Sequence, residues 1–319
     1  MNCVILVFLL LFVTTTFSKA QAQLQIGFYS KTCPNAESIV KSVVKEATLS
    51  NPRAPPILLR LHFHDCFVEG CDSSILIENG PESENKAAEH LGIKGFDYIA
   101  KAKQLIENEC PGVVSCSDIV ALAARDAVVG GPIYEVETGK RDGRVSDSKL
   151  VVAMPRVDES ADSFIAIFKK KGLSNEELII LSGAHTIGTA ACFFMQKSYN
   201  ATNNSDPEIN PRFLPELKRL CPKYGDENVK IPMDPVTGDR FDNQPFRNIK
   251  NGYAVLASDA RFYDDGLTKP VVDFYAKGSQ FGQDFAKALV KMGRIEVKVG
   301  TNGEIRRICN AFNREYYTR

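Results

Sequence analysis

Apolar residues recur at a helical spacing along almost the whole of this 319-residue sequence. Side chains that return every three or four residues form one buried face of a helix, whereas strand residues alternate with a period of two. Only short stretches, such as residues 133–136, follow the strand pattern. A mainly α-helical fold is therefore predicted, with helices over residues 37–49, 56–66, 96–109, 117–128, 160–170, 175–181, 211–220, 270–276 and 280–294.

The ends of these segments carry ordinary start and stop signals. Ser117, Ser160 and Ser174 stand where N-caps are expected, because a serine hydroxyl can accept a hydrogen bond from the first helical turn. Pro55 and Pro56 begin the second segment, where the N–H groups lack helical partners in any case. Residues 224–242 are expected to be the longest irregular segment, and residues 23–319 are expected to form one domain with a large core.

Charge excludes two classes of partner. Basic and acidic residues number 39 each, so the net charge is zero and no basic stripe marks a surface for nucleic acid or membrane. The apolar run at residues 4–13 is too short to span a bilayer. Residues 1–22 are instead predicted to be a signal peptide cleaved before Gln23, with cleavage after Ala20 as an alternative.

Cysteine usage agrees with secretion. Nine cysteines are present, and Cys3 lies in the predicted signal peptide. The remaining eight allow roughly 100 different disulfide pairings, and their number and spacing alone do not identify the correct one. Asn200 and Asn203 begin two N-x-S/T sequons, so both are candidate glycosylation sites.

Two histidine motifs carry the chemistry. Arg60 and His64 are four residues apart, so they share one face of the predicted helix. A titratable imidazole beside a fixed cation can take a proton from one oxygen of a peroxide and stabilise charge on the other. His185, in Leu-Ser-Gly-Ala-His-Thr-Ile-Gly, is expected to face this pair across a haem pocket. His62 lies on a different face of the predicted helix from His64, so we expect it to have a structural role.

Over about residues 23–310 the sequence resembles the class III secretory plant haem peroxidases. The resemblance rests on six motifs in one order: R-L-H-F-H-D-C-F at 60–67, G-C-D-x-S at 70–74, C-P-x-x-V-S-C-x-D at 110–118, L-S-G-A-H-T-I-G at 181–188, F-D-N at 241–243 and S-D at 258–259.

This resemblance implies the haem peroxidase fold, with haem b between distal and proximal helical regions. It also implies a secreted enzyme, extracellular or in the cell wall, that acts as a monomer. Such an enzyme reduces hydrogen peroxide to water through a ferryl intermediate and oxidises phenols or similar small aromatic donors in one-electron steps.

The resemblance assigns roles to individual residues. His185 is the implied iron ligand, and Asp259 accepts its other N–H, which increases the basicity of the ligand. Arg60 and His64 are the implied catalytic residues, with Arg60 lowering the pKa of His64 by charge repulsion. Pro155 is implied in substrate contact.

Two calcium ions are also implied by the resemblance, since both expected sites are rich in the oxygen donors that calcium prefers. The distal set comprises Asp65, Val68, Gly70, Asp72 and Ser74. The proximal set comprises Thr186, Asp234, Thr237 and Asp242. The implied disulfides are Cys33–Cys110, Cys66–Cys71, Cys116–Cys309 and Cys192–Cys221, and a buried salt bridge is implied between Asp118 and Arg141.

Three positions depart from the family pattern. His90 stands where an asparagine usually accepts a hydrogen bond from the distal histidine. A neutral His90 could replace that acceptor, or His90 could be a partly exposed loop residue. Pro155-Arg156-Val157 replaces the usual Pro-x-Pro at the substrate rim, and Tyr134 replaces the family tryptophan.

Two other functional classes share single features with this sequence. His62-x-His64-Asp65 superficially matches a zinc hydrolase motif, but four histidines are too few for a binuclear site of that type. The second is a haem- and calcium-binding wall protein whose peroxidase activity is impaired because His90 replaces the distal asparagine.

Overall fold

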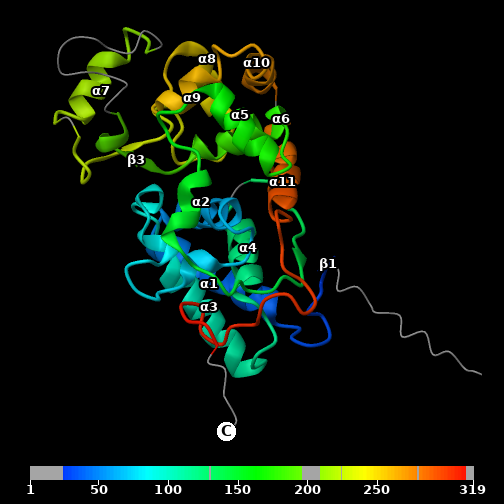
Figure 1. Cartoon of the computed structure of the whole chain (residues 1–319). Helices are drawn as coiled ribbons and strands as arrows, with labels where there is room; N and C mark the ends of the chain where they lie inside the picture. Colours follow the sequence, from blue (N-terminus) through cyan, green and yellow to red (C-terminus); the bar gives the residue numbers. More distant parts are fainter. Residues whose placement is uncertain (1–23, 129–130, 196–208, 224, 279, 314–319) are drawn as a thin grey trace, which may run out of the picture.

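Two groups of helices build the fold (Figure 1). The computed structural model describes residues 24–128, 131–195, 209–223, 225–278 and 280–313. In the first group α1, α2 and α3 pack around α4. In the second group α5, α10 and α11 pack around α6, and α8 packs against α10. The first group comprises α1 (Ala36–Ser50), α2 (Ala54–Phe67), α3 (Phe96–Glu109) and α4 (Cys116–Ala127). The second comprises α5 (Ala161–Lys170), α6 (Asn175–Ser182), α8 (Gln244–Asn251), α9 (Ala257–Arg261), α10 (Lys269–Lys277) and α11 (Phe281–Met292).

One large apolar core runs through both groups. It includes Leu58 and Leu61 of α2, Ile119 of α4, Phe246 of α8 and Phe285 of α11. Full burial of each such side chain contributes about 1.5–3 kcal/mol. A smaller core lies under α7 (Leu214–Leu220), where Leu217 packs with residues of the β3–β4 pair. The mainly α-helical prediction is confirmed.

Strands are few and short among the described residues. β1 (Gln25–Ile26) pairs antiparallel with β2 (Glu137–Thr138), and β3 (Thr189–Ala191) pairs antiparallel with β4 (Lys230–Pro232). The strand predicted at residues 133–136 is wrong, because β2 starts at Glu137. Short 3-10 turns connect the helices: η1 (Ser74–Leu76), η2 (Glu84–Lys86), η3 (Ala88–His90), η4 (Ser148–Ala153), η5 (Gly183–Thr186) and η6 (Cys192–Met195).

Helix starts follow the predicted capping chemistry with one exception. Ser160 and Ser174 cap α5 and α6, and Ser174 forms a capping box with Glu177. α4 is capped by Ser115 rather than by Ser117, which lies inside the helix and donates to the Cys71 carbonyl at 2.5 Å. The two prolines occupy the first turn of α2, as predicted.

The fold brings distant segments to one boundary. α2 is the helix of the first group that lies nearest the second group in Figure 1, below α5 and α9. The η5 turn follows directly on α6 and contacts α8, so it belongs to the second group. The helix that carries Arg60 and His64 and the turn that carries His185 therefore come from opposite groups. No helix among the described residues combines the length and apolar character needed to cross a membrane.

Candidate active site

Arg60 and His64 meet on one face of α2, as their spacing predicts. Arg60 Nε donates to His64 Nε2 at 3.2 Å, and Arg60 Nη2 donates to the Leu91 carbonyl at 3.1 Å. α2 can present these polar groups because most of its other side chains are buried, including Leu58, Leu59 and Leu61. The imidazole and the guanidinium are thus held in direct contact.

His90 extends this pair into a buried chain of polar groups. His64 Nδ1 and His90 Nδ1 are 2.8 Å apart, and His90 Nε2 lies 3.5 Å from Glu84 Oε1. His90 is only 2% exposed and Glu84 is fully buried. The prediction that His90 could be a partly exposed loop residue is therefore wrong, and the chain runs from Arg60 to Glu84.

The order of charges in this chain favours one arrangement of protons. Glu84 faces His90 Nε2, so its negative charge favours the His90 tautomer that carries a hydrogen there. The bare Nδ1 of His90 can then accept from Nδ1–H of His64. This leaves Nε2 of His64, on the side of Arg60, without a proton.

Electrostatics keep His64 neutral. Burial lowers the pKa of His64 well below its usual value, and the charge of Arg60 and proximity of His90 lower it further. Burial also lowers the pKa of Arg60 to about 10, which leaves the guanidinium charged at neutral pH. Burial raises the pKa of Glu84. A neutral base beside a fixed cation results.

The second group of helices positions His185. Its Nδ1 lies 2.7 Å from Asp259 Oδ2, where α9 places the carboxylate. Gly183 allows this turn to pack closely, because a Cβ there would stand 2.5 Å from Phe281 and 2.7 Å from Phe246. The bond to Asp259 occupies Nδ1, so Nε2 is the ring nitrogen that can bind iron.

The two sides share one region of the molecule. The His185 side chain is 36% exposed and Arg60 is exposed, although other protein groups surround both. Arg60 is close enough for its charge to oppose protonation of His185. Burial also acts to lower the pKa of His185, but the charge of Asp259 and its hydrogen bond outweigh both and raise it. The accessible imidazole with an anionic partner fits a haem ligand.

The predicted distal calcium set contains buried oxygens that lack partners. Both carboxylate oxygens of Asp65 and the hydroxyl of Ser74 are buried without a hydrogen bond of normal geometry to the described residues. Burial raises the pKa of Asp65 well above its usual value, and the charges of Asp72 and Glu84 raise it further. Burial of a carboxylate without a partner destabilises the folded protein unless a cation binds it. The oxygens of Asp65 and Ser74 therefore fit a calcium site.

Two lysines bind other oxygen atoms in the loop of the predicted distal calcium set. Lys171 Nζ donates to the Val68 carbonyl at 3.0 Å, and Lys298 Nζ donates to the Glu69 carbonyl at 3.1 Å and pairs with Asp72. The other oxygen of Asp72 accepts from the Ser74 amide at 3.0 Å. Gly70 lies in the same loop, which the Cys66–Cys71 disulfide closes. The lysines leave Asp65 and Ser74 as the donors most open to a cation.

The predicted proximal calcium set converges beside His185. Thr237 Oγ1 contacts Asp234 Oδ2 at 2.9 Å and Asp242 Oδ1 at 3.1 Å, and Thr186 Oγ1 accepts from the Asp242 amide at 3.1 Å. The β3–β4 pair joins these segments, because β3 begins just after Thr186 and β4 ends just before Asp234. Two carboxylates and two hydroxyls in contact fit a hard cation.

Among the described residues, no three or more His, Cys, Asp or Glu side chains converge as a metal site. Each predicted calcium set has only two carboxylates, completed by hydroxyls and backbone carbonyls, so both are compatible with this finding. The zinc hydrolase alternative is not supported. His62 instead lies 3.6 Å from Cys66 Sγ and is buried, and burial together with the Lys140 charge lowers its pKa to about 3.

The four implied disulfides are confirmed. They join Cys33 to Cys110, Cys66 to Cys71, Cys116 to Cys309 and Cys192 to Cys221.

The expected Asp118–Arg141 salt bridge is wrong. Lys140 Nζ lies 3.2 Å from Asp118 Oδ1, and both side chains are buried. Adjacent side chains of extended backbone point to opposite sides. Because Lys140 points to Asp118, Arg141 cannot, and its backbone bridges to Lys298 instead.

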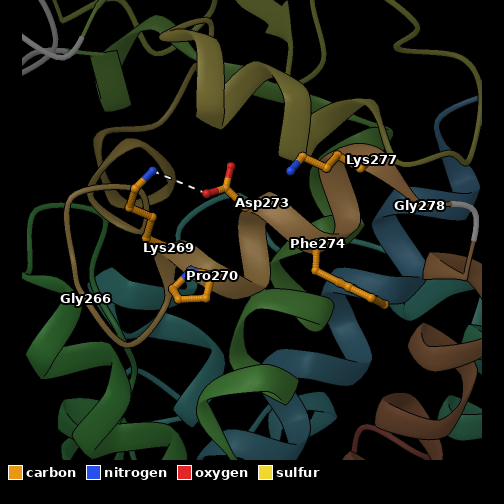
Figure 2. A pocket seen from close by; sticks show the side chains of 7 residues that line it. All are labelled: Gly266, Lys269, Pro270, Asp273, Phe274, Lys277 and Gly278. Carbon is orange, nitrogen blue, oxygen red and sulfur yellow. Dashed lines mark hydrogen bonds and ion pairs between the residues drawn. The ribbon is translucent and has the colours of Figure 1, made fainter.

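One open hollow lies away from the histidine site. Figure 2 shows it on α10, where Lys269, Asp273, Phe274 and Lys277 line a shallow space of about 600 Å³. Lys269 is bound to Asp273 and lies over the Tyr263 ring, so its charge is already engaged. None of its lining residues belongs to the histidine site.

Pro155 is half-buried in the turn after η4. The predicted signal peptide at residues 1–22 and the two sequon residues, Asn200 and Asn203, lie outside the described residues.

Similarity to known proteins shows the family of this chain. The peroxidase family model matches residues 40–278. The chain belongs to the peroxidase family. It is 55% identical to Peroxidase 43 of Arabidopsis thaliana over 94% of this chain and 96% of that protein. It is also 49% identical to Peroxidase 13 of the same plant, over 98% of this chain and 100% of that protein, and 47% identical to Peroxidase N1 of Nicotiana tabacum, over 91% and 90%.

These matches confirm the resemblance to plant haem peroxidases and the assignment as an enzyme that reduces hydrogen peroxide. As a peroxidase, the chain uses a haem cofactor. Sequence reasoning missed Glu84 and Lys298. Glu84 lies six residues before His90 with no regular spacing to suggest contact, and Lys298 reaches the distal loop from the far end of the chain.

Proposed function

We propose that this peroxidase binds haem b through His185, cleaves hydrogen peroxide with Arg60 and His64, and takes electrons from phenols or similar small aromatic donors. Each turnover reduces one hydrogen peroxide to two waters and removes one electron and one proton from each of two phenols. The observation that carries the proposal is the contact of Arg60 with a buried His64 whose pKa is lowered far enough to keep it neutral.

The residues present fit haem. His185 Nε2 is the free ring nitrogen of a partly exposed imidazole, and Asp259 accepts from Nδ1 and so makes the ligand more basic. When bound, haem supplies an iron that accepts two oxidising equivalents from peroxide and returns them one electron at a time.

Proton transfer falls to His64. Its Nε2 accepts the proton of one peroxide oxygen and delivers it to the other, so that the departing oxygen leaves as water. Arg60 stabilises the negative charge that develops on the departing oxygen. General acid–base transfer of this kind typically contributes about 10²–10⁴ in rate.

His90 and Glu84 hold His64 in the form that can act. We assign His90 as the acceptor for Nδ1–H of His64, with Glu84 favouring the proton on the opposite nitrogen of His90. If this orientation were lost, Nε2 of His64 would carry the proton and could not accept another. Both residues are therefore positioning residues.

Two calcium ions are part of the proposal. The partnerless oxygens of Asp65 and Ser74 support the distal site, and the contacts among Thr186, Asp234, Thr237 and Asp242 support the proximal one. Each set stands beside a histidine of the site, so loss of an ion should disturb the site as well as the fold.

Chelation tests the calcium proposal. An ion that binds only the folded protein stabilises it, by about 2.7 kcal/mol when its free concentration is 100 times its Kd. Removal of calcium should lower the melting temperature and change the haem spectrum, and added calcium should restore both. Folded, active protein that contains no calcium by elemental analysis would refute the two sites.

Secretion, glycosylation at Asn200 and Asn203, a monomeric state and substrate contact at Pro155 complete the proposal. The even set of paired cysteines supports an oxidising compartment.

Steady-state assay of the purified holoprotein tests the function as a whole. Oxidation of a phenol that requires hydrogen peroxide, in a protein that contains haem iron, is the expected result. Bound haem and calcium without turnover would favour the wall protein impaired at His90. Absence of bound iron would reject both.

A further inference from the structure

The turn that follows Pro155 lies between the two sides of the active site. On one side, Arg156 Nη1 is 3.6 Å from Glu89 Oε1, and Glu89 is the neighbour of His90 in η3. On the other side, Arg261 Nη1 donates to the Glu159 carbonyl at 2.7 Å, and Arg261 is two residues beyond Asp259. The turn is therefore tied to the distal side and to the proximal side.

Arg156 is the exposed cation of this turn. Its side chain is 59% exposed, compared with 22% for Glu89 and 32% for Asp158. Its turn is closed by a hydrogen bond from the Glu159 amide to the Arg156 carbonyl at 3.0 Å. The backbone is thus fixed while the guanidinium reaches solvent at the edge of the site.

The ion pairs of Arg156 are long and exposed. Its Nε lies 3.4 Å from Asp158 Oδ1, and its pair with Glu89 is longer still. Exposed ion pairs of this kind contribute little and are readily exchanged. A guanidinium has five N–H donors in a planar fork that matches a carboxylate, so Arg156 can bind a third carboxylate or exchange one of its two partners.

We propose that Arg156 is a specificity-determining residue that favours reducing substrates carrying a carboxylate over neutral phenols. The carboxylate of a phenolic acid pairs with Arg156 while its phenol ring enters between the two sides of the site. Glu89 and Asp158 compete for the same guanidinium, so they limit the preference. This inference rests on the proposed oxidation of phenols.

A matched pair of donors isolates the effect of the carboxylate. 4-Hydroxycinnamic acid and its methyl ester carry the same phenol, and only the acid is an anion near pH 7. The measured quantity is the ratio of kcat/KM for the acid to kcat/KM for the ester, with hydrogen peroxide in excess. Because both donors use the same proton-transfer groups, damage to those groups cancels in the ratio.

Three variants are expected to change the acid-to-ester ratio in different ways. Arg156→Gln should lower the acid-to-ester ratio about two- to fivefold, the range for an exposed ion pair, mainly through KM of the acid. Glu89→Gln should raise the ratio, because it removes a competitor for the guanidinium. Arg307→Gln removes an equal charge near the C-terminal end of the described chain and should leave the ratio at its original value.

The outcomes separate this inference from the proposed function. If neither donor is oxidised by the original protein, the phenol oxidation itself is wrong. If both donors are oxidised and Arg156→Gln leaves their ratio unchanged, or Glu89→Gln lowers it, the role of Arg156 is overturned. Added salt should shrink the ratio in the original protein, because exposed charges are screened.

Discussion

The distal and proximal histidines are the same side chain placed in opposite electrostatic surroundings. His64 is 7% exposed and touches the cation of Arg60, whereas His185 is 36% exposed at its side chain and touches the anion of Asp259. The pKa of His64 is lowered, chiefly by burial, and that of His185 is raised because Asp259 outweighs burial. These different surroundings suit His64 to the proposed proton transfer and His185 to the proposed binding of iron.

Removal of the distal imidazole should have the largest effect. His64→Leu should slow the reaction with hydrogen peroxide by about 10²–10⁴, because general acid–base transfer is lost. The haem should remain bound, since His185 and Asp259 are untouched. Rapid mixing of the haem protein with peroxide measures this rate, and an unchanged rate would show that His64 is not the base.

Changes on the proximal side should instead affect haem binding. His185→Ala should loosen haem or change its spin state, because the iron ligand itself is removed. Asp259→Asn should cost about 10–100-fold in haem affinity or activity, the usual range when a partner of a metal-bound histidine is replaced. Haem transfer to an acceptor protein measures the affinity. If both variants keep haem as tightly as the original protein, the proximal assignment fails.

His62 provides a buried histidine without a catalytic role. Its pKa is lowered to about 3 by burial and by Lys140, while in the unfolded chain it is near the ordinary 6.5. Between these values the unfolded state binds a proton that the folded state does not. The free energy of unfolding should therefore fall as pH drops from about 6.5 to 3, by up to about 1.4 kcal/mol per pH unit from this group.

Denaturant unfolding at several pH values tests this expectation. His62→Phe should flatten the acid dependence of stability, although it changes packing in the core as well. An identical slope in the two proteins would contradict the assignment of His62 as a buried neutral residue.

The smallest expected effect is that of replacing His90. Asparagine at this position keeps an acceptor for Nδ1–H of His64, whereas leucine removes it. His90→Leu should therefore slow the reaction with peroxide relative to His90→Asn. His90→Asn should keep or exceed the original rate at neutral pH. Glu84→Gln tests the same contact from its other end and should weaken the orientation of His64. Equal rates of reaction with peroxide for His90→Leu and the original protein would show that His90 does not position His64.

Helical spacing predicted the long helices well but missed α8 and α9. α8 has eight residues, most of them polar, and α9 has five residues, so neither forms an apolar segment long enough to stand out in the sequence. Their positions depend on packing, as Phe246 shows by filling the core beneath Gly183. α9 matters for function nonetheless, because it supplies Asp259.

The candidate site was predictable where motifs are local. Arg60 and His64 follow from helical geometry, and the family motifs supplied His185, Asp259 and the disulfide pairing. Lys140 could not be chosen over Arg141 without knowing which side of the extended chain faces Asp118. Glu84 and the pairing of Arg156 with Glu89 depend on contacts between turns, which no local sequence pattern encodes.

The distal pair and His185 are proposed to form one haem site that reacts with peroxide. The most direct measurement is the optical spectrum of the purified protein before and after one equivalent of hydrogen peroxide. We expect a haem Soret band that shifts when peroxide is added and returns when a phenol is added. A protein without a Soret band, or with one that peroxide leaves in place, would contradict it.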